Sequence, residues 1–117
     1  MPLKVDRSSL ESGVEVITLA GSLTLGRDAQ NLELLVEELI KNQKTRIVFD
    51  LTEVSFVDSA GIGILVGSFG KVSKAGGKLR MAALTPRVLN VLKISKVEKL
   101  LGLDENVAAS LAALAAS

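Results

Sequence analysis

The architecture of this chain centres on Val54-Ser-Phe-Val-Asp-Ser-Ala-Gly-Ile-Gly-Ile-Leu-Val66. The apolar run at residues 45–51 precedes it and predicts a strand covered on both faces, and apolar residues at helical spacing follow it. Ser59 falls where a helix would place its N-cap, because a hydroxyl there accepts a hydrogen bond from a free backbone N–H. A helix N-terminus also tolerates an anion. Ser59 is therefore either only a cap or also a phosphorylation site.

The N-terminal part predicts a hairpin followed by a helix. Leu3–Ser9 and Val14–Ala20 are rich in strand-forming residues, and Ser12-Gly13 supplies the turn between them. Gly21–Gly26 is predicted to be a loop. Apolar residues then recur at helical spacing, which predicts an amphipathic helix from about Asp28 to Asn42.

A loop at Thr52–Val57 and a central helix from about Ala60 to Ala75 are expected next. On a helical projection Ile64 falls off the predicted core face. Gly67 and Gly70 are expected to pack against the protein's own neighbouring elements, whereas Gly63 and Ile64 are open to contact by a partner. The predicted core face consists of Ile62, Leu65, Val66, Phe69 and Val72.

The C-terminal part continues the alternation of strands and helices. Lys78–Leu84 predicts a strand, and Thr85 is expected to cap a helix that begins at Pro86. Leu100–Leu103 is a possible edge strand, and Asp104 is expected to cap an Ala-rich helix over about 105–115. The order β-β-α-β-α-β-α, with a possible final β-α, predicts one α/β domain over residues 1–117. Its sheet is mixed but mainly parallel, with an N-terminal hairpin and about four helices.

Composition excludes several classes of function. The 117 residues contain no cysteine and no histidine, which rules out disulfides and a Ser-His-Asp triad within one chain. No apolar run is long enough to span a membrane, and no signal-peptide pattern is present. We therefore expect a soluble cytoplasmic protein that does not insert into membranes.

Charge is distributed unevenly along the chain. Residues 1–40 carry three basic and seven acidic side chains, and residues 41–117 carry eleven basic and six acidic ones. This asymmetry reflects either two ordinary solvated faces or a polarised surface that orients a protein partner. Direct DNA binding is not expected, because the basic residues form no dense cluster interleaved with aromatic residues.

None of the enzyme motifs that the sequence approaches is complete. Val57-Asp-Ser-Ala-Gly61 lacks the first glycine of a nucleophile elbow. Gly61-Ile-Gly63 follows a strand, but no acidic residue follows the next strand to hold a ribose. Gly76-Gly77-Lys78 is followed by leucine rather than serine or threonine, so it is no phosphate-binding loop. We expect neither catalysis nor a cofactor or metal ion.

Phe56-Val-Asp-Ser-Ala-Gly-Ile-Gly63 resembles the signature of STAS domains, specifically of bacterial anti-sigma factor antagonists. Three flanking segments resemble the same family, and with them the resemblance covers nearly the whole chain. They are the preceding strand at Ile47–Leu51, the turn at Ala75–Leu79 and the helix at Pro86–Leu92.

The resemblance implies a phosphoprotein that regulates transcription by partner switching. The serine at the position of Ser59 is phosphorylated in that family by an anti-sigma factor that is itself a serine kinase. Phosphorylation abolishes binding to the kinase, and a protein serine phosphatase restores it. The residues expected to bind the partner are Ser22, Thr24, Asp58, Ser59, Ala60, Gly61, Gly63 and Ile64.

One departure from the family pattern leaves an alternative open. Many antagonists carry Gly-Glu-Leu-Asp before the first helix, where this chain has Gly21-Ser-Leu-Thr24 and a loop one residue longer. The alternative is a STAS subunit with a scaffold role, in a stress-sensing complex or beside a lipid-transport ATPase. The intact Asp58-Ser59 pair favours the switch. The sequence does not specify the oligomeric state, the sigma factor or the kinase.

Overall fold

The computed structural model describes residues 2–116 and contains one five-stranded sheet in the order β1-β2-β3-β4-β5. β1 and β2 pair antiparallel as a hairpin, whereas β2, β3, β4 and β5 pair parallel. The predicted mixed, mainly parallel sheet is therefore confirmed. The strands are β1 (Lys4–Ser9), β2 (Glu15–Leu23), β3 (Arg46–Val57), β4 (Lys78–Ala82) and β5 (Leu103–Asp104).

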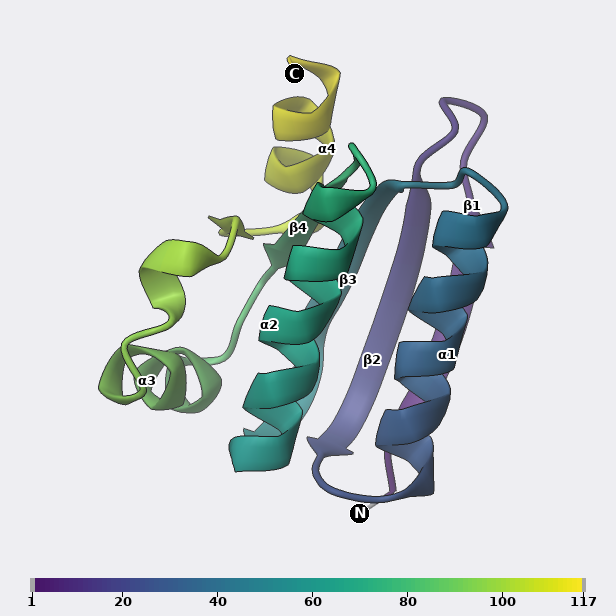
Figure 1. Ribbon diagram of the computed structural model, residues 1–117. Helices are drawn as coiled ribbons and strands as arrows, with labels where there is room; N and C mark the ends of the chain where they lie inside the picture. Colours follow the sequence, from purple (N-terminus) through teal and green to yellow (C-terminus); the bar gives the residue numbers. More distant parts are fainter. Residues whose placement is uncertain (1, 117) are drawn as a thin grey trace.

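Helices cover the two faces of this sheet unequally (Figure 1). α1 and α2 lie side by side on one face, and their buried residues join the main core. α3 lies toward the β4 side of the sheet and adds Val88 and Leu92 to that core. α4 packs on the opposite face, where Leu114 and Val48 belong to one buried apolar cluster. The helices are α1 (Arg27–Lys41), α2 (Ser59–Lys74), α3 (Pro86–Ile94) and α4 (Val107–Ala115), with a 3-10 turn, η1 (Glu98–Leu100).

β3 is longer than the sequence pattern indicates, because it continues through the residues that were expected to form a loop at Thr52–Val57. β2 likewise extends through Gly21–Leu23, so that only Thr24–Gly26 remain between it and α1. The pairing of β2 with β3 shifts register twice, and at each shift β3 has one residue more than β2. Bulges of this kind break the period-two alternation that identifies a strand in a sequence.

The glycines of α2 do not pack as expected. A Cβ atom added at Gly63, Gly67 or Gly70 would have no atom within 4 Å. The prediction that Gly67 and Gly70 pack against neighbouring elements is therefore wrong. At Gly61, in contrast, a Cβ would lie 2.1 Å from the carbonyl oxygen of Leu23. This glycine is the one that lets the start of α2 lie against the end of β2.

The C-terminal elements confirm one predicted cap and correct another. The Thr85 hydroxyl accepts a hydrogen bond from the N–H of Val88, as expected. α4, however, is capped by Asn106 and not by Asp104. Asp104 lies in β5, which begins at Leu103 instead of spanning Leu100–Leu103. Its carboxylate is already engaged, because the Arg80 guanidinium binds both of its oxygens at 2.8 Å.

Candidate functional site

The candidate site lies where β3 ends and α2 begins. Leu23, the last residue of β2, is paired with Val57, the last residue of β3. The N–H of Asp58 donates to the Leu23 carbonyl oxygen at 3.3 Å, so the turn into α2 is attached to the neighbouring strand. Two parallel strands and the N-terminus of a helix therefore meet around Asp58 and Ser59.

Asp58, and not Ser59, is the N-cap of α2. Its Oδ1 accepts a hydrogen bond of 2.8 Å from the N–H of Gly61. Its Oδ2 accepts one of 3.2 Å from the N–H of Leu25, in the loop between β2 and α1. The expectation that Ser59 caps the helix is wrong by one residue, because β3 runs through Val57 and leaves Asp58 in the extended capping conformation.

These backbone donors also fix the charge of the capping residue. The N–H of Gly61 contributes most, and together with those of Leu25 and Ala60 it holds the pKa of the Asp58 carboxyl below its ordinary value. Hydrogen bonds to the ionised form have this effect in general. Asp58 therefore places a full negative charge at the start of α2 at neutral pH.

Ser59 is the first residue of α2, and its side chain is exposed to solvent. Within residues 2–116 its hydroxyl makes no hydrogen bond, and the Asp58 carboxylate is the side chain that accepts from the Gly61 N–H in the first turn. The first N–H groups of a helix point outward at this end and favour anions. The hydroxyl is accessible, and a group attached to it would lie in an environment that tolerates negative charge.

The other predicted contact residues on α2 differ in how much surface they offer. Gly63 is exposed, Ala60 is half-buried, and Gly61 is buried against β2. Ile64 is only 8% exposed and belongs to the main core, so its predicted position off the core face is wrong. Ile62 is half-buried and packs against the edge of that core instead.

The end of β2 and the loop before α1 bring two further predicted residues to the same end of the molecule. Ser22 and Thr24 are both half-buried and line a hollow of about 120 Å³. Leu25 follows them and is 78% exposed, although the sequence patterns did not single it out. The one signal in the sequence that could have identified it is an apolar residue directly before Gly26, in the stretch predicted to be a loop.

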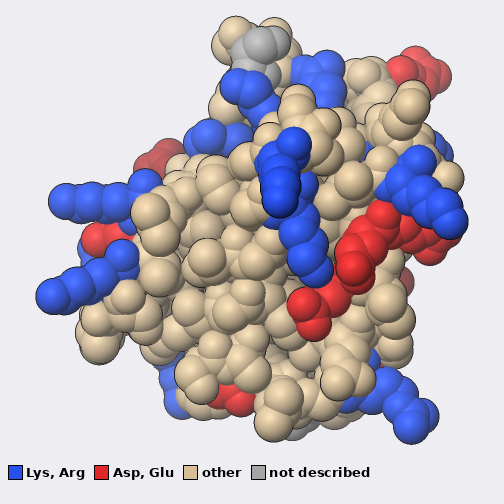
Figure 2. Space-filling view, in the orientation of Figure 1, with Lys and Arg blue, Asp and Glu red and all other residues tan. Residues whose placement is uncertain are grey.

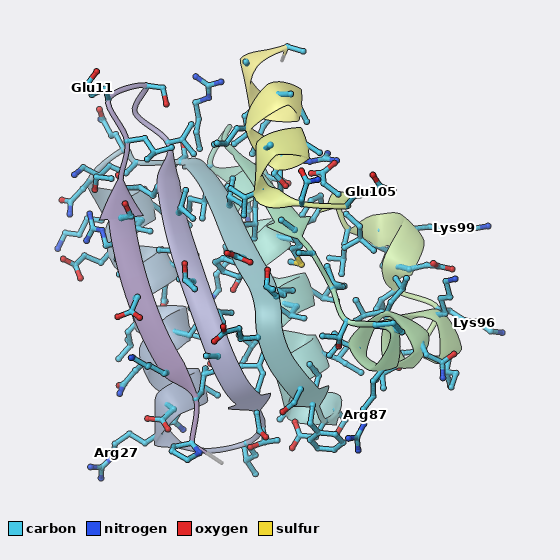
Figure 3. All side chains as sticks on the ribbon, turned by 180° about the vertical axis from the view of Figure 1, so that it is seen from behind. Glu11, Arg27, Arg87, Lys96, Lys99 and Glu105 are labelled. Carbon is cyan, nitrogen blue, oxygen red and sulfur yellow. The ribbon has the colours of Figure 1, made fainter. Side chains whose placement is uncertain are left out.

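Arginines flank this end of the molecule, as Figure 3 shows for Arg27 and Arg87. Arg27 begins α1 and extends outward. The Arg87 guanidinium lies 5.2 Å from the centroid of the Phe56 ring, a cation–π contact between α3 and β3. Among residues 2–116 there is no cluster of three or more acidic side chains arranged to hold a metal ion. The exposed groups at this end include the Ser59 hydroxyl and the Leu25 side chain.

The STAS domain family model matches residues 10–111 of the chain. The chain belongs to the STAS domain family. This STAS domain is 29% identical to the anti-sigma-B factor antagonist of Bacillus subtilis (strain 168) over 106 residues, which cover 89% of this chain and 93% of that protein.

Solved structures share the fold of this STAS domain. An anti-sigma factor antagonist from Mycobacterium paratuberculosis superposes with a TM-score of 0.81 at 22% identity, covering 97% of this chain and 94% of that one. The phosphorylated form of the Bacillus cell fate determinant SpoIIAA superposes with a TM-score of 0.74 at 18% identity, covering 93% and 97%. Within the described part of this STAS domain, no helix is both long and apolar enough to cross a membrane.

Proposed function

We propose that this STAS domain is an anti-sigma factor antagonist controlled by phosphorylation at Ser59. Unphosphorylated, it binds an anti-sigma factor that is a serine kinase and thereby releases a sigma factor. The kinase phosphorylates Ser59 and dissociates, and a protein serine phosphatase restores the binding form. The similarity to the Bacillus subtilis antagonist over most of both chains supports this assignment.

The observation that carries the proposal is the separation of tasks between Asp58 and Ser59. Asp58 caps α2 and binds the adjoining loop. The Ser59 hydroxyl is exposed and is not needed as the helix cap. A phosphate there would carry close to two negative charges. Because it would lie at a helix N-terminus, the fold would accept it.

A partner that covers Ser59 would not accept the same phosphate. The new charge would lie beside the ionised Asp58, and docking would remove both charges from water. Burying two adjacent negative charges costs more than burying one, and this cost opposes binding. Phosphorylation of Ser59 thus acts on the interface while leaving the fold in place.

The direct test is to incubate the protein with ATP and each anti-sigma kinase encoded in its own genome. We expect one added phosphate by intact mass and its location on Ser59 by peptide sequencing. Ser59→Ala should abolish the modification. Ser73→Ala, which alters an exposed serine near the other end of α2, should not.

Absence of modification by any active kinase would contradict the proposal. The scaffold role, in a stress-sensing complex or beside a lipid-transport ATPase, would then become the leading hypothesis. A phosphate on a serine other than Ser59 would retain the antagonist assignment but refute the proposed switch.

A further inference from the structure

Leu25 is the most exposed large apolar side chain within residues 2–116. Its exposed fraction is 78%, compared with 72% for Ile94 at the end of α3 and 59% for Leu100 in η1. Single exposed apolar residues are common on protein surfaces and by themselves require no explanation. The position of Leu25 relative to Ser59 is what gives it significance.

Leu25 is held in place by the residue that precedes Ser59. Its backbone N–H donates to Oδ2 of Asp58 at 3.2 Å, while the other carboxylate oxygen of Asp58 caps α2. On its C-terminal side, the carbonyl oxygen of Gly26 accepts a hydrogen bond from the N–H of Gln30 in α1. The backbone of Leu25 is therefore fixed on both sides, and a partner that buries its side chain would order little additional chain.

A partner whose interface is centred on Ser59 would also cover Leu25. A specific interface buries about 800 Å² on each partner, a patch roughly 30 Å across. The whole protein measures only 31 × 27 × 23 Å. Because Leu25 is hydrogen-bonded to the residue before Ser59, it lies well inside a patch of that size centred on Ser59.

The surface of α2 beyond Ser59 is suited to apolar contact. From Ser59 onward, α2 carries no charged side chain before Lys71. Figure 2 shows a broad uncharged area on the face formed by the helices. Arg27 and Arg87 lie at the outside of the same end. An apolar centre with a charged rim is the usual anatomy of a protein–protein interface.

We propose that Leu25 is an apolar anchor that inserts into an apolar pocket on the anti-sigma kinase. This inference rests on the proposed function and adds the chemistry of recognition to it. The kinase surface that receives Leu25 is apolar, and it lies beside the part of the kinase that reaches Ser59. Specificity for this kinase then depends on the loop between β2 and α1 as well as on the serine.

The test compares the affinities of the unphosphorylated wild type, Leu25→Ser and Leu100→Ser for the kinase that modifies Ser59, measured by isothermal titration calorimetry. Removing a buried leucine side chain should weaken binding by about tenfold or more. Leu100→Ser is the matched control, since η1 lies away from this end of the molecule in Figure 1. It should bind within about twofold of the wild type, as surface substitutions usually do.

Two further readouts distinguish loss of an apolar anchor from damage to the fold and from a change in electrostatic attraction. The melting temperature of Leu25→Ser should equal that of the wild type, because the exposed side chain contributes little to folding. The ratio of the wild-type affinity to the Leu25→Ser affinity should also persist from about 0.1 M to about 1 M salt, since screening weakens charge interactions but not apolar burial.

Equal binding by Leu25→Ser and the wild type would overturn the anchor and leave the phosphorylation switch intact. An affinity ratio that disappears at high salt would also overturn it. Failure of the wild type itself to bind any anti-sigma kinase would overturn the proposed function and the anchor together.

Discussion

Asp58 and Ser59 have different tasks although both residue types are good helix caps. Asp58 binds the N–H groups of Gly61 and Leu25 and so joins α2 to the loop before α1. Ser59 presents an exposed hydroxyl one position later. At the scale of single residues, this division allows a serine to be modified at a helix start without removing the cap.

Ser59→Ala should leave the stability of the protein nearly unchanged. The substitution removes no hydrogen bond found within residues 2–116, and alanine is the better helix former. We expect the free energy of unfolding in urea to change by less than about 0.5 kcal/mol. A loss of about 1 kcal/mol or more, the usual cost of removing a cap, would show that Ser59 and not Asp58 caps the helix.

Gly61→Ala and Gly63→Ala should have opposite effects on stability. The added methyl at Gly61 would meet the Leu23 carbonyl oxygen at 2.1 Å, and such overpacking costs about 1–3 kcal/mol. At Gly63 the space is open, and alanine should stabilise the helix by up to about 1 kcal/mol. Chemical denaturation of both variants measures the difference. Equal destabilisation would contradict the close contact between α2 and β2.

The sequence predicted that Asp58 and Ser59 lie between a strand and a helix, but not how their side chains bond there. The cap was misplaced because Asp58 and Ser59 are equally good candidates, and only the end of β3 at Val57 decides between them. The helical projection placed Ile64 off the core face, whereas it is only 8% exposed. An apolar residue on the flank of a helix is buried or exposed according to its neighbours, which a helical projection does not contain.

At the scale of elements, the helices and the hairpin were predicted well, and the end of β3 was not. Leu51, Val54 and Val57 all reach the main core although they are three residues apart. Strict alternation would place Val54 on the face opposite to that of Leu51 and Val57, so the pattern indicated a loop. The two register shifts against β2 restore them to one face. Bulges depend on pairing between strands and are not visible in one strand alone.

The pair of Arg80 and Asp104 joins β4, β5 and α4. Arg80 binds both carboxylate oxygens at 2.8 Å, and the Ser110 hydroxyl donates to one of them at 2.7 Å. Asp104→Asn should lower the free energy of unfolding by about 2 kcal/mol, as expected for hydrogen bonds that involve charged groups. Hydrogen exchange in α4 should accelerate. Glu105→Gln, at an exposed neighbour, is the control and should change neither quantity.

At the scale of the whole molecule, three carboxylates make the fold sensitive to acid. The hydrogen bond from Arg80 lowers the pKa of Asp104, and backbone N–H groups, that of Gly61 foremost, lower the pKa of Asp58. Burial opposes ionisation of Glu15, but bonds from Arg7 and Ser9 outweigh it and leave its pKa lowered too. All three carboxylates favour the folded state when they are ionised.

Stability should therefore fall as the pH falls below the ordinary carboxyl range, around 4. The contribution is fully present above the unfolded-state pKa values, and it is lost as the pH passes down through the lower folded-state values. Urea midpoints between pH 7 and pH 2.5 measure this loss. The free energy of unfolding of Asp104→Asn should fall less than that of the wild type over the same pH range. Equal losses would show that the Asp104 carboxylate is not linked to folding.

The most direct test of the Ser59 switch compares the unphosphorylated protein with the same protein carrying phosphate on Ser59. Affinity for the anti-sigma kinase is measured by calorimetry, and folding is followed by circular dichroism. We predict that phosphorylation weakens binding by at least about tenfold, while the melting temperature stays within a few degrees of its original value. Unchanged affinity would contradict the switch, and lost binding accompanied by unfolding would contradict its location at the interface.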